Sequence, residues 1–202
     1  MANSAPTKGN LMAAKRSRTL AENGWELMDK KRNILIRELM SLLERVKTLQ
    51  EEIDECFTAA YEALALAELD GDCKRAAQSI PEENSVRLRW RSVMGVELPT
   101  VTDDEPETGV LPYALAESSS ALDVAYRRFT RVRGLLSDMA EVENAVYRLA
   151  FAIKKSQKRA NALQNIVIPG LEVDIRRISE ALAEKEREEF VRQKVIKAKK
   201  EA

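Results

Sequence analysis

A heptad pattern of apolar and small residues runs without interruption along the first part of this chain. It constrains the fold more than any other feature, because a helix with such a seam must bury it against a second helix. Its positions alternate in steps of four and three: Leu35, Leu39, Leu42, Val46, Leu49, Ile53, Cys56, Ala60, Ala63 and Ala67. The sequence therefore predicts a long helix here that is paired with another helix.

A second seam in the C-terminal half supplies the partner. Its two runs are Leu122, Ala125, Phe129, Val132, Leu136 and Met139, then Val146, Leu149, Ile153, Ser156, Ala160, Leu163 and Val167. The spacing predicts a shift of register between the runs, near Glu143. Two long heptad helices on either side of an irregular middle segment fold most economically as an antiparallel pair. The expected fold is therefore all-α, a long antiparallel two-helix coiled coil with a small head, and its chain ends meet at one tip.

The middle segment differs from both helices because residues that break helices cluster in it. They are Pro81, Gly95, Pro99, Pro106, Gly109 and Pro112. The alternation of Val86, Leu88 and Trp90, followed by a turn near Gly95, predicts a short β-hairpin in the head. A two-stranded hairpin is marginal in water by itself, so it should pack on a helix or a partner. The expected segments are a flexible N-terminus at 1–10, a shaft helix at 11–69, the head at 70–115 and a second shaft helix at 116–200.

Local signals refine the ends and interruptions of the helices. Thr7 or Asn10 is expected to cap the first helix. Gly24 lies inside the helical pattern at a cost of about 1 kcal/mol relative to Ala, and close approach of the partner backbone is one reason for its presence. Pro169 and Gly170 interrupt the second helix and predict a kink near Pro169, either a simple one or a bend that shapes the surface of the shaft.

The charge of the chain is balanced overall and uneven locally. Lys and Arg number 33, as do Asp and Glu, so no global field favours nucleic acid or an anionic membrane. Cations without acids gather at the two ends: Lys8, Lys15, Arg16 and Arg18, then Arg192, Lys194, Lys197, Lys199 and Lys200. Antiparallel pairing is expected to bring 8–18 beside 190–200. Such a tip is a solvated end, a contact for acidic side chains of a protein partner, or a nucleic-acid contact.

No pattern typical of an enzyme is present in the sequence. It has no His, its seven glycines are scattered, and it lacks the GxxxxGK[ST] phosphate loop, so we expect neither catalysis nor a nucleotide or other cofactor. The acidic run Asp103, Asp104, Glu105 and Glu107 lacks the Gly of an EF-hand loop. We therefore expect a solvated loop there, without a metal.

The cysteines and the hydropathy bear on the compartment. Cys56 and Cys73 lack metal-ligand spacing and are expected to be reduced thiols of a cytosolic protein. The sequence contains no apolar run of about 18 residues and no signal-peptide pattern. A cytoplasmic protein without direct membrane insertion is therefore expected.

Two motifs near the ends of the chain identify a known family. The resemblance rests on PTKGNLMAAKRSRTLAENGWELMDKKRNILIREL, from Pro6, and on KRANALQNIVIPGLEVDIRRISEALAEKEREEFVRQKVIK, from Lys158. Together they resemble the D subunit of the V-type (archaeal/vacuolar-type) rotary ATPases. The resemblance covers nearly the whole chain, and between 70 and 117 it is limited to general character and the VMGVELP turn.

The resemblance implies a central rotor stalk that transmits torque and performs no bond chemistry. Its paired ends, with the basic tip, would enter the cavity of the hexamer of subunits A and B. The head and lower shaft would contact subunits F and C (d in eukaryotes), binding the former and docking on the latter, which links rotation to the ion-translocating ring of the membrane. From the residues alone, a freestanding coiled-coil scaffold and a DNA-binding hairpin with a basic tip are the alternatives.

Overall fold

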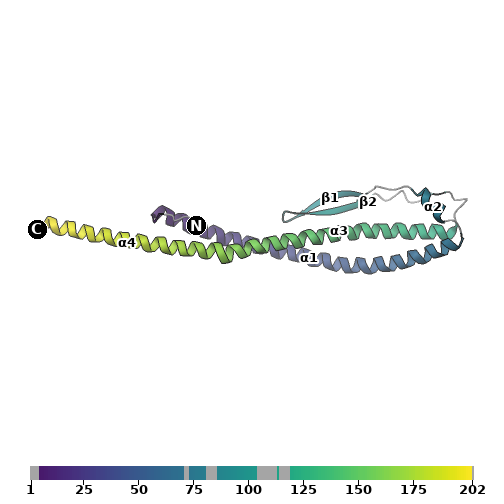
Figure 1. Cartoon of the computed structure of the whole chain (residues 1–202), viewed down its shortest axis with the longest axis horizontal. Helices are drawn as coiled ribbons and strands as arrows, with labels where there is room; N and C mark the ends of the chain where they lie inside the picture. The colour runs from purple at the N-terminus through teal and green to yellow at the C-terminus, as the bar shows by residue number, and fades with distance from the viewer. Residues whose placement is uncertain (1–4, 71–72, 81–85, 104–112, 114–118, 202) are drawn as a thin grey trace. The chain divides into compact units, whose positions relative to one another are not determined.

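The computed structural model of the chain describes residues 5–70, 73–80, 86–103, 113 and 119–201 (Figure 1). In chain order the elements are α1 (Lys8–Asp70), α2 (Cys73–Ser79), β1 (Val86–Val93), β2 (Val96–Asp103), α3 (Ser120–Ala162), the π-helical turn η2 (Leu163–Val167) and α4 (Ile168–Glu201). They form two compact units: unit 1 is Met1–Asn33 with Ile153–Ala202, and unit 2 is Ile34–Ala152. Helices α1 and α3 contribute residues to both units, and each unit is described by itself.

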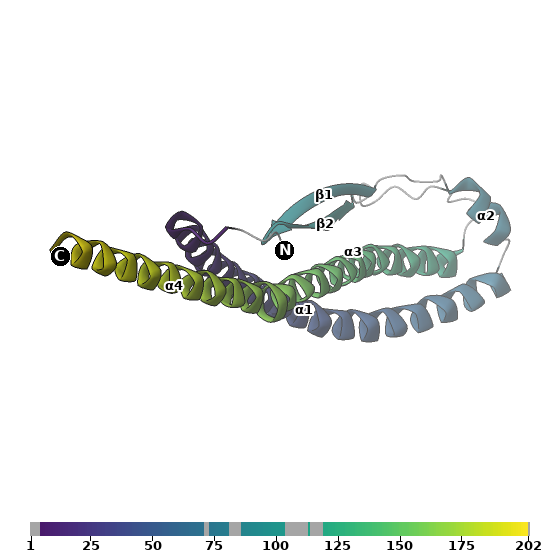
Figure 2. The same cartoon turned by 60° about the vertical axis from the view of Figure 1, so that its left-hand side comes forward.

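In unit 2, α1 and α3 lie side by side in opposite directions (Figures 1 and 2). Arg128, near the start of α3, donates a hydrogen bond from Nη1 to the carbonyl of Ala59, near the end of α1, at 2.5 Å. The rings of Tyr61 and Phe129 meet edge to face, with their centroids 5.6 Å apart. The predicted fold class, a long antiparallel helix pair with a small β-hairpin, is confirmed.

The residues of the two predicted seams occupy buried or half-buried positions, with one exception. The buried members are Leu35, Leu49, Ile53, Ala60, Ala63, Ala67, Ala125, Val132, Leu149, Ser156 and Ala160. The half-buried members are Leu39, Leu42, Val46, Cys56, Leu122, Phe129, Met139, Val146, Ile153, Leu163 and Val167. Each Å² of apolar surface removed from water in this stripe contributes about 25 cal/mol to the stability of the helix pair.

The exception is Leu136, whose assignment to the seam is wrong, because its side chain is 44% exposed. The neighbouring Leu135 is half-buried instead, and Val142 is buried. Counting from Leu135, the seam continues in steps of four and three through Met139 and Val142. The register therefore shifts just after Val132 and not near Glu143. Two adjacent leucines satisfy the sequence pattern equally well, and the fit against α1 decides which of them turns inward.

The β-hairpin forms where the alternation of apolar residues predicts it. Strands β1 and β2 pair antiparallel, with Val93 opposite Val96 and Trp90 opposite Pro99. The two residues of the turn, Met94 and Gly95, both have positive φ, at 50° and 74°. Positive φ at both central residues defines a type I′ turn, whose twist matches that of the flanking strands. Because hydrogen-bonded pairs alternate along the ladder from the turn outward, Pro99 takes a non-bonded place, where its missing N–H costs nothing.

Polar contacts fasten the hairpin to the helices of unit 2. The backbone N–H of Val101 donates to Oε2 of Glu141 on α3 at 2.6 Å. Arg148 of α3 donates from Nη1 to the carbonyl of Glu97 at 3.3 Å, and its guanidinium lies 4.7 Å from the centre of the Trp90 ring. On the other helix, Glu38 of α1 pairs with Arg91 at 2.8 Å. The outer edge of β2 is thereby capped by side chains of α3, as the marginal stability of an isolated hairpin requires.

The far end of unit 2 is closed by small residues and one tyrosine. Ala63, Ala67 and Ala125 form a buried cluster against which Cys73 of α2 packs. Tyr113 is buried, and its hydroxyl donates to Oδ1 of Asp123 at 2.8 Å. Burial, reinforced by this bond to a carboxylate, raises the pKa of the Tyr113 hydroxyl well above its usual range. The tyrosine thereby ties the chain to the start of α3.

Candidate partner-binding surfaces

The basic N-terminal segment of unit 1 is held by a helix cap. Oγ1 of Thr7 accepts a hydrogen bond from the backbone N–H of Asn10 at 3.2 Å. The side chain of Asn10 donates instead to the carbonyl of Ala5, at 2.7 Å. Thr7 is therefore the cap of α1, and it satisfies one of the amides that a helix start leaves without a partner. As a result, the first cation of the chain, Lys8, lies in the first turn of α1.

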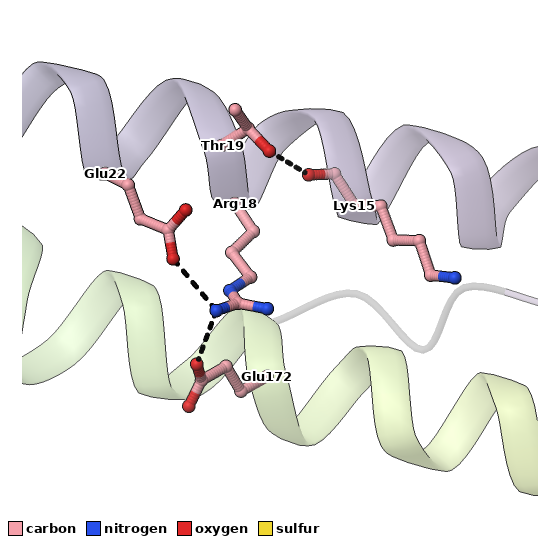
Figure 3. Close-up of polar contacts among 5 residues, drawn as sticks. All are labelled: Lys15, Arg18, Thr19, Glu22 and Glu172. Atoms are coloured by element: carbon pink, nitrogen blue, oxygen red, sulfur yellow. Dashed lines mark hydrogen bonds and ion pairs between the residues drawn. The ribbon is translucent and has the colours of Figure 1, made fainter.

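Two interhelical ion pairs define how α1 and α4 are aligned in unit 1. Nζ of Lys8 lies 3.0 Å from Oε1 of Glu186. Nη2 of Arg18 lies 3.4 Å from Glu172 of α4 and 3.0 Å from Glu22 of its own helix (Figure 3). Lys15, whose carbonyl accepts a bond from the Thr19 hydroxyl, extends its ammonium group away from these carboxylates (Figure 3). Exposed pairs of this kind contribute about 0–1 kcal/mol each, so they report the alignment more than they create it.

This alignment separates the two basic clusters that were expected to meet. Lys8 is level with Glu186, so the whole cluster 192–200 lies beyond the start of α1 (Figure 1). From Glu186, α4 continues to Glu201, about 22 Å at a rise of about 1.5 Å per residue. The expectation that 8–18 lies beside 190–200 is wrong. Heptad spacing fixes which face of a helix points at its partner, but it does not fix how far one helix slides along the other.

The segment of α4 beyond Glu186 is an exposed surface of mixed character. Arg192 pairs with Glu188 one turn earlier at 3.8 Å, and the ammonium of Lys194 lies 4.6 Å from the centre of the Phe190 ring. Its exposed large apolar side chains are Phe190, Val191, Val195 and Ile196. Sequence reasoning missed these four, although apolar residues beyond the last seam position were the signal that could have found them. We call residues 187–201 the C-terminal overhang.

The predicted tip residues thus fall into two groups. Lys8, Lys15, Arg16 and Arg18 lie on the paired part of α1, whereas Arg192, Lys194, Lys197 and Lys199 lie on the overhang. All eight are exposed. Their role in binding a partner stays a prediction, now for two separate surfaces.

The π-helical turn η2 lies at the point where a kink near Pro169 was expected. In an α-helix the ring of Pro169 would clash with the carbonyl of Asn165. Here the N–H of Ile168 bonds to the carbonyl of Leu163, five residues earlier, and Ile168 keeps helical angles of φ −62° and ψ −51°. The wider turn moves the Asn165 carbonyl away from the ring, so the helical backbone continues through the proline.

The extra residue of η2 also changes the phase of the buried stripe. Leu163 and Leu171 are half-buried and eight residues apart, one more than a heptad. Beyond the turn the stripe continues through Ile175 and Ile178, and the side chain of Ile178 is only 2% exposed. The π turn therefore keeps the apolar face of α4 directed at α1 despite the added residue.

Gly24, on α1 opposite the start of η2, is not explained by close backbone approach. A Cβ atom placed there would lie 3.8 Å from Cδ1 of Leu163, which is ordinary van der Waals contact. That proposed reason for the glycine is therefore corrected, and Ala would fit at this position.

Small-ligand chemistry finds few suitable groups in unit 1 and unit 2. Within the described ranges, no group of three or more His, Cys, Asp or Glu side chains could hold a metal ion. Of the predicted acidic run, Asp104, Glu105 and Glu107 lie outside the described residues. Cys56 and Cys73 are free cysteines. Searched over the same part of the chain, no helix is long and apolar enough to cross a membrane.

Comparison with known proteins relates this architecture to one family. Residues 10–198 match the ATP synthase D subunit family. The D subunit of the V-type ATP synthase of Thermotoga neapolitana is 42% identical over 198 residues, which cover 96% of this chain and 97% of that protein. The D subunit of the A-type ATP synthase of Thermococcus kodakarensis is 35% identical, with 99% and 96% covered, and that of Pyrococcus furiosus is 36% identical, with 98% and 94% covered.

Proposed function

Because the chain belongs to the ATP synthase D subunit family, we propose that it is the central-stalk rotor subunit of a V-type rotary ATP synthase or ATPase. In this role it transmits torque between the catalytic AB hexamer and the ion-translocating ring, and it performs no bond chemistry itself. The observation that carries the proposal is the full-length family match on a pair of long antiparallel helices. A rotor component of this kind lies at the membrane surface without inserting into the bilayer.

The paired helices suit the transmission of torque. A single helix twists easily, whereas two helices whose side chains interlock along a common stripe must break packing contacts to twist against each other. In unit 1 the stripe is continued through η2 to Ile178, and in unit 2 the aromatic contact between Tyr61 and Phe129 spans the pair. This packing supports a load-transmitting role.

The proposed partners divide along the chain. The C-terminal overhang, which carries both cations and exposed apolar side chains, is the surface we propose for the cavity of the AB hexamer. A cavity wall with acidic and apolar groups would match both kinds of side chain. The hairpin and unit 2 are the proposed region for subunits F and C, as the family resemblance implies.

The overhang can be removed without disturbing the alignment of the helices. A chain ending at Glu189 keeps the Lys8–Glu186 ion pair and loses the cations and apolar groups beyond it. Coexpressed with subunits A, B, F and C, this chain should still bind the F protein. ATP-driven rotation, followed with a bead on the rotor, should fall by about tenfold or more, which corresponds to about 1.4 kcal/mol of lost coupling.

Two controls make the experiment decisive. A full-length chain in which the overhang lysines become arginines and Arg192 becomes lysine keeps the charge and should rotate normally. Calorimetric titration of the isolated chain with magnesium ATP should give no binding heat, and micromolar binding would contradict a noncatalytic role. A wild-type chain that binds none of the ATP synthase subunits and only self-associates would be a freestanding scaffold.

A further inference from the structure

One stretch of unit 1 carries uncompensated positive charge. Between Asn144 and Leu171 the sequence contains no Asp or Glu, in a chain where acids and bases are equal in number. The part of this stretch that lies in unit 1 carries four cations on the last three turns of α3: Lys154, Lys155, Lys158 and Arg159. All four side chains are exposed.

Other exposed cations of these helices have an acid one turn away. Lys30 lies 2.6 Å from Glu26, Arg187 lies 3.4 Å from Glu184, and Arg192 lies 3.8 Å from Glu188. Within the described part of the chain, the structure gives the four α3 cations no ion pair. The pattern of local neutralisation used elsewhere is therefore suspended at this point.

The four cations also repel one another. Lys154 and Lys158 are four residues apart, as are Lys155 and Arg159, and like charges at this spacing destabilise a helix. At about 100° per residue, the four side chains spread over an arc of about 140°. The buried residues Ser156 and Ala160 lie on the opposite side of α3, so the charged arc faces directly away from the helix pair.

Helix α1 adds a fifth cation at the same level. Gly24 faces Leu163 across the antiparallel pair, so two turns further along, Lys31 comes level with Ser156. Lys31 has no ion pair among the described residues, whereas its neighbour Lys30 is paired with Glu26. We call Lys31, Lys154, Lys155, Lys158 and Arg159 the cationic belt.

We propose that the cationic belt docks against a carboxylate-rich surface of the protein ring that surrounds the shaft, at a level separate from the overhang. This inference rests on the proposed function, which supplies the ring. A broad outward arc of charge fits a partner that encloses the helices, and complementary charge would steer assembly and fix the axial position of the shaft. Between 152 and 162 the chain has no aromatic side chain, so the belt lacks the stacking platforms typical of single-strand nucleic-acid sites.

The test removes the charge and retains the helix. In one variant Lys154, Lys155, Lys158 and Arg159 all become Gln. In the matched control the three lysines become Arg and Arg159 becomes Lys. Gln, Lys and Arg have similar helix propensities, so both variants should keep the far-ultraviolet circular dichroism of the wild type.

The readout is the NaCl concentration that releases half of the rotor from the immobilised complex with the catalytic ring. Exposed charge contacts are screened over about 8 Å at physiological ionic strength, so removal of the four charges should lower this concentration by about twofold or more. The control should match the wild type. Equal release of the Gln variant and the wild type would overturn the belt and leave the proposed function standing.

The remaining outcomes also decide. A wild-type chain that fails to assemble with the ring would overturn both proposals at once. If wild-type chain retards a DNA duplex at about 0.15 M salt and the Gln variant does not, while rotor release is unchanged, the belt binds nucleic acid and the proposal is wrong.

Discussion

Deletion of Asn165 tests the role of the π turn in setting the phase of α4. Without this exposed residue the turn contains one residue fewer and can close as a regular α-helix. Everything downstream then rotates by about 100° about the helix axis relative to α1. Ile178, which is 2% exposed, would leave the buried stripe, and Pro169 would meet the carbonyl four residues earlier.

The two consequences have separate magnitudes. Loss of the buried Ile178 contacts should cost about 2–5 kcal/mol, as for a buried Ile replaced by Ala. A proline in an α-helical interior costs about 3 kcal/mol. The deletion should therefore reduce the free energy of unfolding of unit 1 by roughly 5 kcal/mol or more. Adding Pro169→Ala to the deletion should recover about 3 kcal/mol, whereas Pro169→Ala alone should change stability by about 1 kcal/mol or less, because η2 already relieves the clash.

The chain contains its own reporter for this measurement. Of its two tryptophans, Trp25 lies in unit 1 and Trp90 in unit 2. In a Trp90→Phe background, urea unfolding followed by Trp25 fluorescence reports on unit 1 alone. Asn165→Ala, which keeps the length, is the matched control and should leave the midpoint nearly unchanged. If the deletion and the control unfold at the same urea concentration, η2 does not set the phase of α4.

Three further substitutions test other parts of the structure by thermal or urea unfolding. Gly24→Ala should stabilise the protein by about 1 kcal/mol, since its Cβ finds ordinary contact and helix propensity rises; a loss would mean that α1 and Leu163 approach more closely than described. Leu149→Ala should cost about 2–5 kcal/mol, but Leu136→Ala only about 0.5 kcal/mol, and similar losses would restore Leu136 to the seam. Met94→Asn should slow amide exchange in the hairpin, because Asn tolerates positive φ better than Met, and faster exchange would contradict the type I′ turn.

The sequence by itself determined which residues turn inward and where the main elements lie. Steps of three and four residues dictate the buried face of a helix, because that periodicity follows from the geometry of the helix itself. Leu35, Leu49 and Leu149 are buried for this reason. Alternating residues before Gly95 likewise specified the hairpin, and a threonine before Lys8 offered the helix cap.

Only the tertiary structure decided how far the helices slide, which of two adjacent leucines is buried, and how the proline is accommodated. A repeating pattern records rotation about a helix axis but is nearly unchanged by translation along it. The pairing of Lys8 with Glu186 therefore depends on contacts between segments that lie far apart in the chain. The choice of Leu135 over Leu136 depends on the facing surface of α1 in the same way. The π turn arises because both the ring of Pro169 and the burial of Ile178 must be satisfied in one helix, and that requirement exists only when α4 lies against its partner.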